Sequence, residues 1–266
     1  MVVPGTGPVR VETLTSWSRI AQSLPRIGHR AEPVYAADVG EWSRMFRTGV
    51  DPGERPDPDL PRRLVESLGM GPTAMDHDVT GSSVDPGEYV LGTPECMLTE
   101  APEPTPVRSV RIGLDTGVTG GVPAGSLVRT VSGIVSAVSA METMGWTVSV
   151  DVLDITDALD DLGRPLGIWC LHIPVKRPDA VLNPRRLAWA CGHPNMNRDT
   201  VFAWLADVTG CPDGQWRILV AHGGRSSEGV IRAVLGPDTV PVTLMSLVRM
   251  EDPARGLAMM CMGVGR

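Results

Sequence analysis

The stretch Val107-Arg-Ser-Val-Arg-Ile-Gly-Leu-Asp115 decides the fold class of this 266-residue chain. It is short and apolar, like a buried strand, and it leads into the glycine-rich turn Thr116–Gly121. Apolar residues then recur at the spacing of one helical face until Gly145 ends the helix; they are Leu127, Val131, Ile134, Val135, Val138 and Met141. A strand, a turn and an amphipathic helix in this order predict an α/β unit.

The segments that follow continue this alternation. Two strands separated by the short polar segment Asp157–Arg164 predict a hairpin. The expected strands lie at 147–155, 166–175, 216–221 and 240–248, and the expected helices at 182–210 and 226–235. This order predicts an open, mostly parallel, Rossmann-like sheet with helices on both faces, in a domain at residues 106–266.

The N-terminal part of the chain has a different pattern. The expected helices there lie near 14–24, 36–47 and 61–68. Asp85 followed by Pro86 predicts the start of a further short helix, within a segment that otherwise has the character of an ordered loop. The proline-rich segment Ala101–Pro106 indicates a boundary. We therefore expect a helical, loop-rich and acidic region at 1–105 ahead of the sheet domain.

Composition narrows the class of protein. Hydrophobic residues make up 42% of the chain, and no apolar run reaches the roughly 18 residues of a membrane span. Residues 1–105 hold 16 acids and 9 arginines, whereas residues 106–266 hold 15 acids and 15 bases. Neither part has the excess of basic residues that binding to a nucleic-acid phosphate backbone requires, so nucleic acid is not the favoured partner. Five cysteines without a visible secretion signal favour reduced thiols in a cytoplasm.

The first candidate site is Asp115-Thr-Gly-Val-Thr119, at the carboxyl end of the first sheet strand, where open α/β sheets bind ligands. The spacing resembles the Asp-x-Ser-x-Ser metal site of von Willebrand factor A domains. Asp115 and Thr119 match that pattern, Gly117 lacks the hydroxyl, and His222 lies where the later acid is expected. One carboxylate and one hydroxyl are too few for a divalent cation, so no cofactor is expected. The simpler alternative is that Asp115 caps the turn and the start of the helix that follows.

A second candidate is a zinc site formed by two Cys-x-His pairs. Residues two apart on a strand face the same way, so Cys170 and His172 form one pair, and Cys191 and His193 form another. The alternative is that each cysteine is a small buried apolar residue. The acidic residues around Asp85 and Glu95 are expected to be solvated instead of metal-binding.

Two longer stretches resemble an uncharacterised family of bacteriophage and prophage proteins. One is Asp78-Val-x-Gly-x-x-Val-Asp85-x-x-x-Tyr89-x-x-Gly92-x-Pro94-Glu95-Cys96-Met97, and the other is His193-Pro-x-Met196-x-Arg198. The resemblance implies a viral or mobile-element context and no chemistry. The residues that it marks as a shared surface are Asp85, Gly92, Pro94, Glu95, His193 and Arg198.

Three functions follow as hypotheses. The favoured one is a non-enzymatic assembly or protein-interaction protein of a phage or mobile element, cytoplasmic or virion-associated, that binds a protein partner or itself. The second is a hydrolase or nuclease in which Asp115 acts with Glu95, His193 or His222. The third is a nucleic-acid accessory protein that uses Arg185, Arg186 and Arg198.

Overall fold

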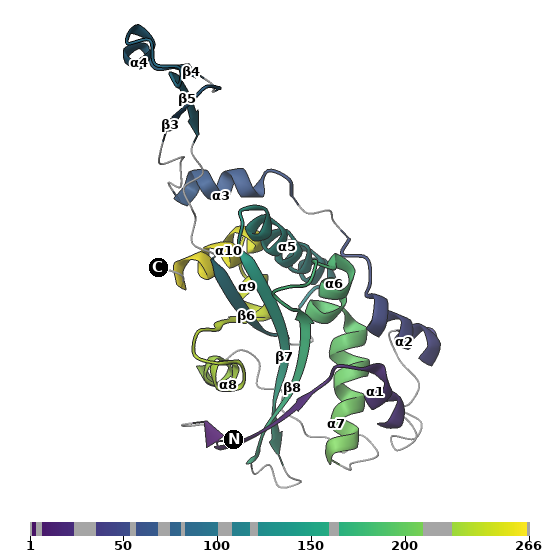
Figure 1. Cartoon of the computed structure of the whole chain (residues 1–266). Coiled ribbons are helices and arrows are strands. Elements are labelled where there is room, and N and C mark those ends of the chain that lie inside the picture. The colour runs from purple at the N-terminus through teal and green to yellow at the C-terminus, as the bar shows by residue number, and fades with distance from the viewer. Residues whose placement is uncertain are drawn as a thin grey trace.

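The structure is a computed structural model of the whole chain (Figure 1). It describes residues 2–3, 7–23, 36–53, 57–68, 75–80, 83–100, 108–117, 122–159, 165–209 and 225–264. The expected strand at 216–221 and the candidate residues Thr119 and His222 lie outside these ranges.

A six-stranded mixed sheet, mostly parallel, forms the centre of the molecule, in the order β1-β2-β8-β7-β6-β9. Its strands are β1 (Val2–Val3), β2 (Gly7–Thr13), β6 (Ser109–Asp115), β7 (Thr147–Leu159), β8 (Pro165–Lys176) and β9 (Val240–Thr243). β6 runs parallel to both β7 and β9, and β2 runs parallel to β8. β7 and β8 pair antiparallel over most of their length, which confirms the predicted hairpin.

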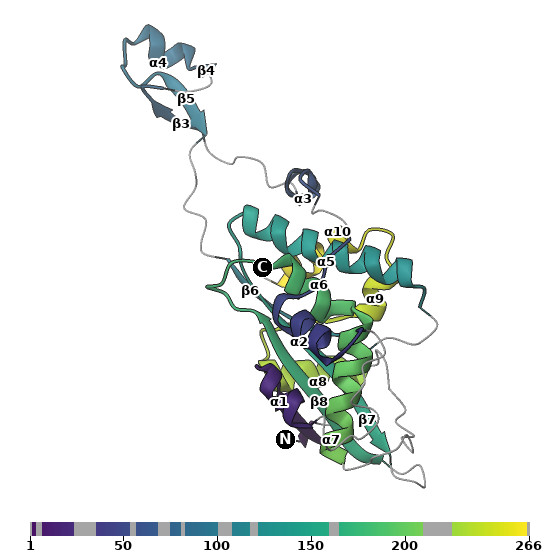
Figure 2. The same ribbon diagram turned by 90° about the vertical axis from the view of Figure 1, so that its right-hand side faces the viewer.

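Helices cover both faces of this sheet (Figures 1 and 2). One face carries α8 (Arg225–Leu235), which packs a small core of aliphatic residues such as Val230 and Ile231 against β7 and β8. The other face carries the larger core and most of the remaining helices, among them α5 (Ala124–Thr143), α6 (Pro184–Gly192), α7 (Val201–Thr209), α9 (Leu244–Val248) and α10 (Pro253–Val264). A π-helical segment, Asn195–Thr200, joins α6 to α7.

The long helix after β6 was predicted correctly, and Gly145 follows its end with a φ of 81°. The predicted strand at 240–248 was wrong in its second half. The chain turns into α9 after Thr243, because the Thr243 hydroxyl accepts a hydrogen bond from the Ser246 amide and so caps a helix.

The N-terminal region was predicted to be helical and irregular, but it also supplies the strands β1 and β2 of the main sheet. β2 has the alternating pattern of a half-exposed strand, with Val9 buried against the α8 face. The helices are α1 (Trp17–Ser23), α2 (Val39–Thr48) and α3 (Leu60–Leu68). Trp42 and Phe46 of α2 and Leu64 of α3 are buried in the larger core, beside residues of the sheet domain.

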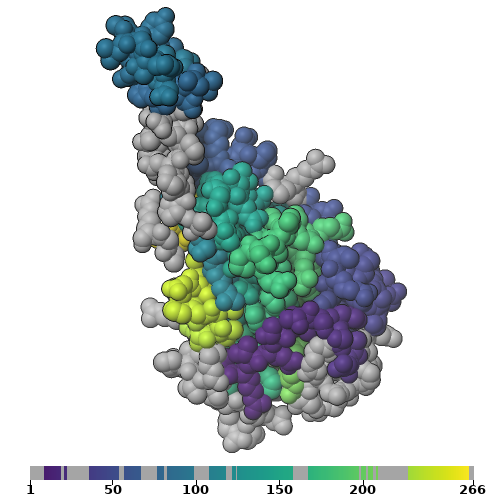
Figure 3. Space-filling model, in the orientation of Figure 1, coloured from purple at the N-terminus to yellow at the C-terminus, as the bar shows by residue number. Residues whose placement is uncertain are grey.

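A small unit at residues 75–80 and 83–100 stands away from the rest of the molecule; we call it the arm (Figures 1 and 3). It consists of the antiparallel strands β3 (Met75–Asp78), β5 (Met97–Glu100) and β4 (Ser83–Val84), with the short helix α4 (Pro86–Val90). The helix starts where Asp85 and Pro86 predict it, whereas the strands were expected as a loop. Among the described residues, no helix is both long and apolar enough to cross a membrane.

Candidate functional site

Asp85 organises the arm. Its Oδ1 atom accepts hydrogen bonds from the amides of Gly87 (2.8 Å) and Glu88 (3.4 Å), which caps α4. Its Oδ2 atom lies 3.0 Å from Nε2 of His77 on β3. The bond to His77 and then the two amides hold the pKa of Asp85 below its ordinary value. Asp85 therefore ties the helix of the arm to its sheet.

Gly92 and Cys96 also serve the local fold of the arm. Gly92 has a φ of 71°, a conformation that favours glycine, at the turn that follows α4. The Cys96 carbonyl accepts a hydrogen bond of 2.8 Å from the Asp85 amide. Three residues of the Asp78–Met97 motif, Asp85, Gly92 and Cys96, thus have structural roles in the arm, whereas Glu95 is exposed.

The surface of the arm combines exposed apolar side chains with acids. Tyr89, Val90 and Leu91 are 66%, 83% and 77% exposed, and Val79 and Val84 are exposed as well. Residues 75–100 contain six of the chain's 31 acids and none of its 24 lysines and arginines. The arm thus carries nearly all of the net charge of −7. Large apolar side chains that gather on an exposed unit indicate an interaction surface.

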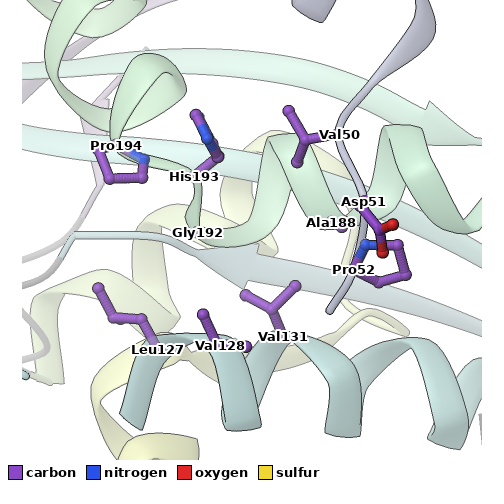
Figure 4. Close-up of a pocket in the computed structure, with 10 residues that line it drawn as sticks. All are labelled: Val50, Asp51, Pro52, Leu127, Val128, Val131, Ala188, Gly192, His193 and Pro194. Atoms are coloured by element: carbon purple, nitrogen blue, oxygen red, sulfur yellow. The ribbon is translucent and has the colours of Figure 1, made fainter. Parts of the chain in front are cut away.

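A second feature is a pocket with a cavity volume of about 100 Å³ on the face of the sheet opposite α8 (Figure 4). α5 forms its floor with Leu127, Val128 and Val131, and the end of α6 forms another wall. The remaining lining residues are Val50, Asp51, Pro52, Ala188, Gly192, His193 and Pro194. The lining is mostly aliphatic, so the pocket is suited to one or two apolar side chains.

His193 of this pocket follows the last residue of α6. Its Nδ1 atom accepts a hydrogen bond of 3.2 Å from the Asn195 amide, which assigns the proton of the neutral ring to Nε2. Burial lowers the pKa of His193, against the opposing charges of Asp199 and Glu41. His193 is therefore a neutral wall of the pocket near pH 7.

Asn195, which the sequence did not single out, is the buried residue that holds the His-Pro segment in place. Its Oδ1 atom accepts from Trp189 Nε1 (3.0 Å), and its Nδ2 atom donates to Asp199 Oδ2 (2.8 Å). Its carbonyl accepts from Thr200 Oγ1 (3.1 Å), which in turn accepts from Trp42 Nε1 (3.0 Å) on α2. Met196 lies in the core, and nothing is described for the Arg198 side chain.

The third feature is Asp115 at the carboxyl end of β6. The side chain is fully buried, and its Oδ1 atom accepts a hydrogen bond of 3.0 Å from the Gly117 amide. Asp115 therefore caps its own turn, as the simpler alternative proposed, but it does not cap the helix, because α5 begins at Ala124 with Pro123 as its N-cap. Within the described residues, its Oδ2 atom and the nearby Ser227 hydroxyl at the start of α8 make no hydrogen bond.

Burial raises the pKa of Asp115 to about 7, and the charge of Asp154 on the neighbouring strand contributes to the rise. Burial also raises the pKa of Asp154 to about 6, although Thr156 donates a hydrogen bond of 2.9 Å to it. Asp154 could have been noticed in the sequence as one of the acids of β7, but so could Asp151 and Asp157, and the sequence does not say which of them lies beside Asp115. Ser227 carried no such signal.

Of the candidate catalytic residues that the structure describes, neither Glu95 nor His193 lies beside Asp115. Glu95 belongs to the arm (Figure 1), and His193 lies on the opposite face of the sheet from Ser227. The four candidate zinc ligands are also apart, since Cys170 lies in the core under α8 and Cys191 in the larger core. Burial raises the pKa of both thiols. No metal-binding group of three or more His, Cys, Asp or Glu occurs among the described residues.

His172 belongs to a polar network that crosses the sheet. Its Nε2 atom lies 2.7 Å from Asp151 Oδ1, and its Nδ1 atom lies 3.1 Å from Thr13 Oγ1. Arg111 bonds the same carboxylate at 2.7 Å and also donates to the Leu235 carbonyl at the end of α8. Burial raises the pKa of Asp151, but the bonds from His172 and Arg111 outweigh it and hold the pKa low. The network ties β2, β8, β7 and β6 together.

The described residues thus form a mixed α/β protein with an acidic, apolar-surfaced arm and a separate aliphatic pocket. The profile of DUF7192, a domain of unknown function, matches residues 67–217, and the chain belongs to this family. The matched range contains the arm, β6 to β8 and most of the pocket. No curated protein and no solved structure shows a significant match.

Proposed function

We propose that this chain is a non-enzymatic interaction protein that binds a protein partner through the arm. The observation that carries the proposal is the exposure of Tyr89, Val90 and Leu91 on a unit that projects from the body. Each large apolar side chain that a partner covers contributes roughly 1.5–3 kcal/mol, whereas a solvated arm gains nothing from these residues. An apolar surface with six acids and no base suits a partner that has an apolar cleft with a basic rim.

A phage or mobile-element context is part of this proposal. It is supported by the resemblance of the Asp85–Met97 and His193–Arg198 segments to bacteriophage and prophage proteins. In that setting the partner would be another protein of the same element, and the chain would act in a cytoplasm or on a virion.

The proposal predicts that the arm variant Val90→Ser/Leu91→Ser loses its partner while it keeps its fold. Both side chains are exposed, so their replacement should change the melting temperature by no more than about 2 °C. Tagged wild-type and variant chains would be compared by affinity capture from the cells that encode them. Binding of a partner should fall about tenfold or more in the variant.

The matched control is Val181→Ser, because Val181 is also an exposed apolar residue, at 93%, but lies between β8 and α6. Equal recovery of every bound protein by the wild type, the arm variant and the control would overturn the proposal. Circular dichroism and thermal melting would show that each chain is folded.

A hydrolase or nuclease with Asp115 at its centre is a second proposal. It is supported by the burial of Asp115, its pKa of about 7 and its position at a strand end ahead of the long helix α5. It is also supported by the resemblance of Asp115-Thr-Gly-Val-Thr119 to the metal-site pattern of von Willebrand factor A domains. Hydrolysis of DNA, RNA or a simple ester with magnesium present should then fall at least about 100-fold in Asp115→Asn. The exposed-site control Asp179→Asn should keep full activity. Absence of hydrolysis by the wild type would end this second proposal.

A further inference from the structure

We propose that the partner of the arm is a second copy of this chain, and that Val90 and Leu91 of one copy enter the aliphatic pocket of the other. This inference rests on the proposed interaction function and names its partner. It joins the arm, which stands away from the rest of the molecule (Figures 1 and 2), to the pocket, seven of whose ten lining residues belong to the same family domain.

The first support is the match in size and polarity between the pocket and the end of α4. The pocket, with a cavity volume of about 100 Å³, is lined by aliphatic side chains of α5 and α6 and by Pro52 and Pro194 (Figure 4). Val128 at its edge is 47% exposed, so an incoming side chain can reach it without rearrangement of the core. Val90 and Leu91 are neighbouring aliphatic residues of suitable size for this space.

The second support is charge complementarity. Arg129 follows Val128 on α5, and Arg185 lies one helical turn before the pocket residue Ala188 on α6. Both arginines are exposed, and within the described part of the chain neither forms an ion pair. The one acid in the pocket wall, Asp51, accepts a hydrogen bond from the Gly53 amide in its own turn. The acids of an incoming arm would therefore meet arginines on both sides of the pocket.

The third support is symmetry. Each copy has one arm and one pocket, so two copies can exchange arms around a two-fold axis and satisfy both sites at once. The two contacts then reinforce each other, because the second forms within the complex that the first has made. We therefore expect a closed dimer instead of an open filament.

The test is the oligomeric state of the purified full-length chain, measured by sedimentation over a range of concentrations. The wild type should dimerise, and about 0.5 M salt should weaken the dimer through the exposed charges. The pocket variant Val128→Asp and the arm variant Val90→Ser/Leu91→Ser should each raise the dissociation constant about tenfold or more. Val181→Asp places the same new charge at an exposed valine elsewhere and should leave the dimer unchanged.

A cross-link then identifies the contact. Val90→Cys and Val128→Cys would be made in two chains of different length, mixed and oxidised. A disulfide between the two chains is the expected product, and a mixture with Val181→Cys in place of Val128→Cys should give none. A disulfide formed within a single chain that carries both changes, in a monomer, would show that the arm folds onto its own pocket and would overturn the inference.

The two proposals fail separately. A wild type that stays monomeric up to about 100 µM, or a dimer that Val128→Asp leaves intact, overturns the arm-to-pocket exchange. If the dimer test fails but the arm variant captures less of some other protein than the wild type does, the interaction function stands with that protein as the partner. If neither assay responds to the arm variant, both proposals are wrong.

Discussion

Replacement of Gly49 by alanine should destabilise the fold by about 4 kcal/mol or more, which is among the largest effects of a single substitution. Gly49 ends α2 with a φ of 76°, and its amide donates to the Met45 carbonyl. A Cβ atom there would lie 2.1 Å from the carbonyl carbon and oxygen of Arg185 at the start of α6. Both obstacles are backbone atoms, so no side-chain rotation relieves the overlap, and α2 must separate from α6.

Gly145→Ala is the matched control for this prediction. Gly145 has a similar φ of 81°, but its added Cβ atom meets nothing within 4 Å. It should therefore cost only the backbone strain, about 1–2 kcal/mol. Thermal melting should show a drop of about 10 °C or more for Gly49→Ala, or a failure to fold, against a few degrees for the control. Equal melting temperatures for the two variants would contradict the structure.

The second large effect is a loss of stability as the pH rises from about 4 to 7. Asp115 and Asp154 are buried, with pKa values of about 7 and about 6. In the unfolded chain both carboxyls ionise near pH 4, so the folded state holds protons that the unfolded state has released. This stabilisation is complete below the unfolded pKa and disappears as the pH passes the folded pKa. For Asp115 alone it is on the order of 4 kcal/mol.

Asp115→Asn should remove most of this dependence. The amide oxygen of asparagine can still accept from Gly117, and the side chain has no charge to bury. In urea unfolding at pH 5 and pH 8, the wild type should lose stability between the two values. The variant should lose much less and should be the more stable protein at pH 8. The difference between the wild type and the variant reports Asp115, because Asp154 contributes its own pH dependence to both proteins.

Asp179→Asn is the control, because Asp179 is exposed on the turn after β8 and its change should leave the slope as in the wild type. Asp85 and Asp151 have lowered pKa values, so the stabilisation that they supply is lost only as the pH falls below about 4. They therefore do not mask the window between pH 5 and 8, whereas His193, whose pKa is lowered, adds stability as the pH rises to about 6.5 in the wild type and the variant alike. A wild type whose change in stability across this window equals that of Asp115→Asn would show that Asp115 is ionised in the fold.

Local patterns predicted a large part of the fold. The periodicity between Leu127 and Met141 predicted α5, and the two apolar runs around a polar segment predicted the β7–β8 hairpin. Asp85 and Pro86 predicted the start of α4. These three predictions succeeded because helix capping and amphipathic spacing depend only on residues that are a few positions apart in the chain. β2 and the strands of the arm were not predicted, because the formation of short strands depends on partner strands far along the chain.

The sequence by itself determined the α/β class, the main helix, the hairpin and the acidic character of residues 75–100, since composition and local spacing are properties of the chain alone. Only the tertiary structure decided which candidate residues meet. It placed Cys170 and Cys191 in different cores, separated His193 from Asp115, and put Asp154 and Ser227 beside Asp115. It also exposed the arm and opened the pocket. Burial and proximity arise from long-range packing, which no stretch of this sequence encodes alone.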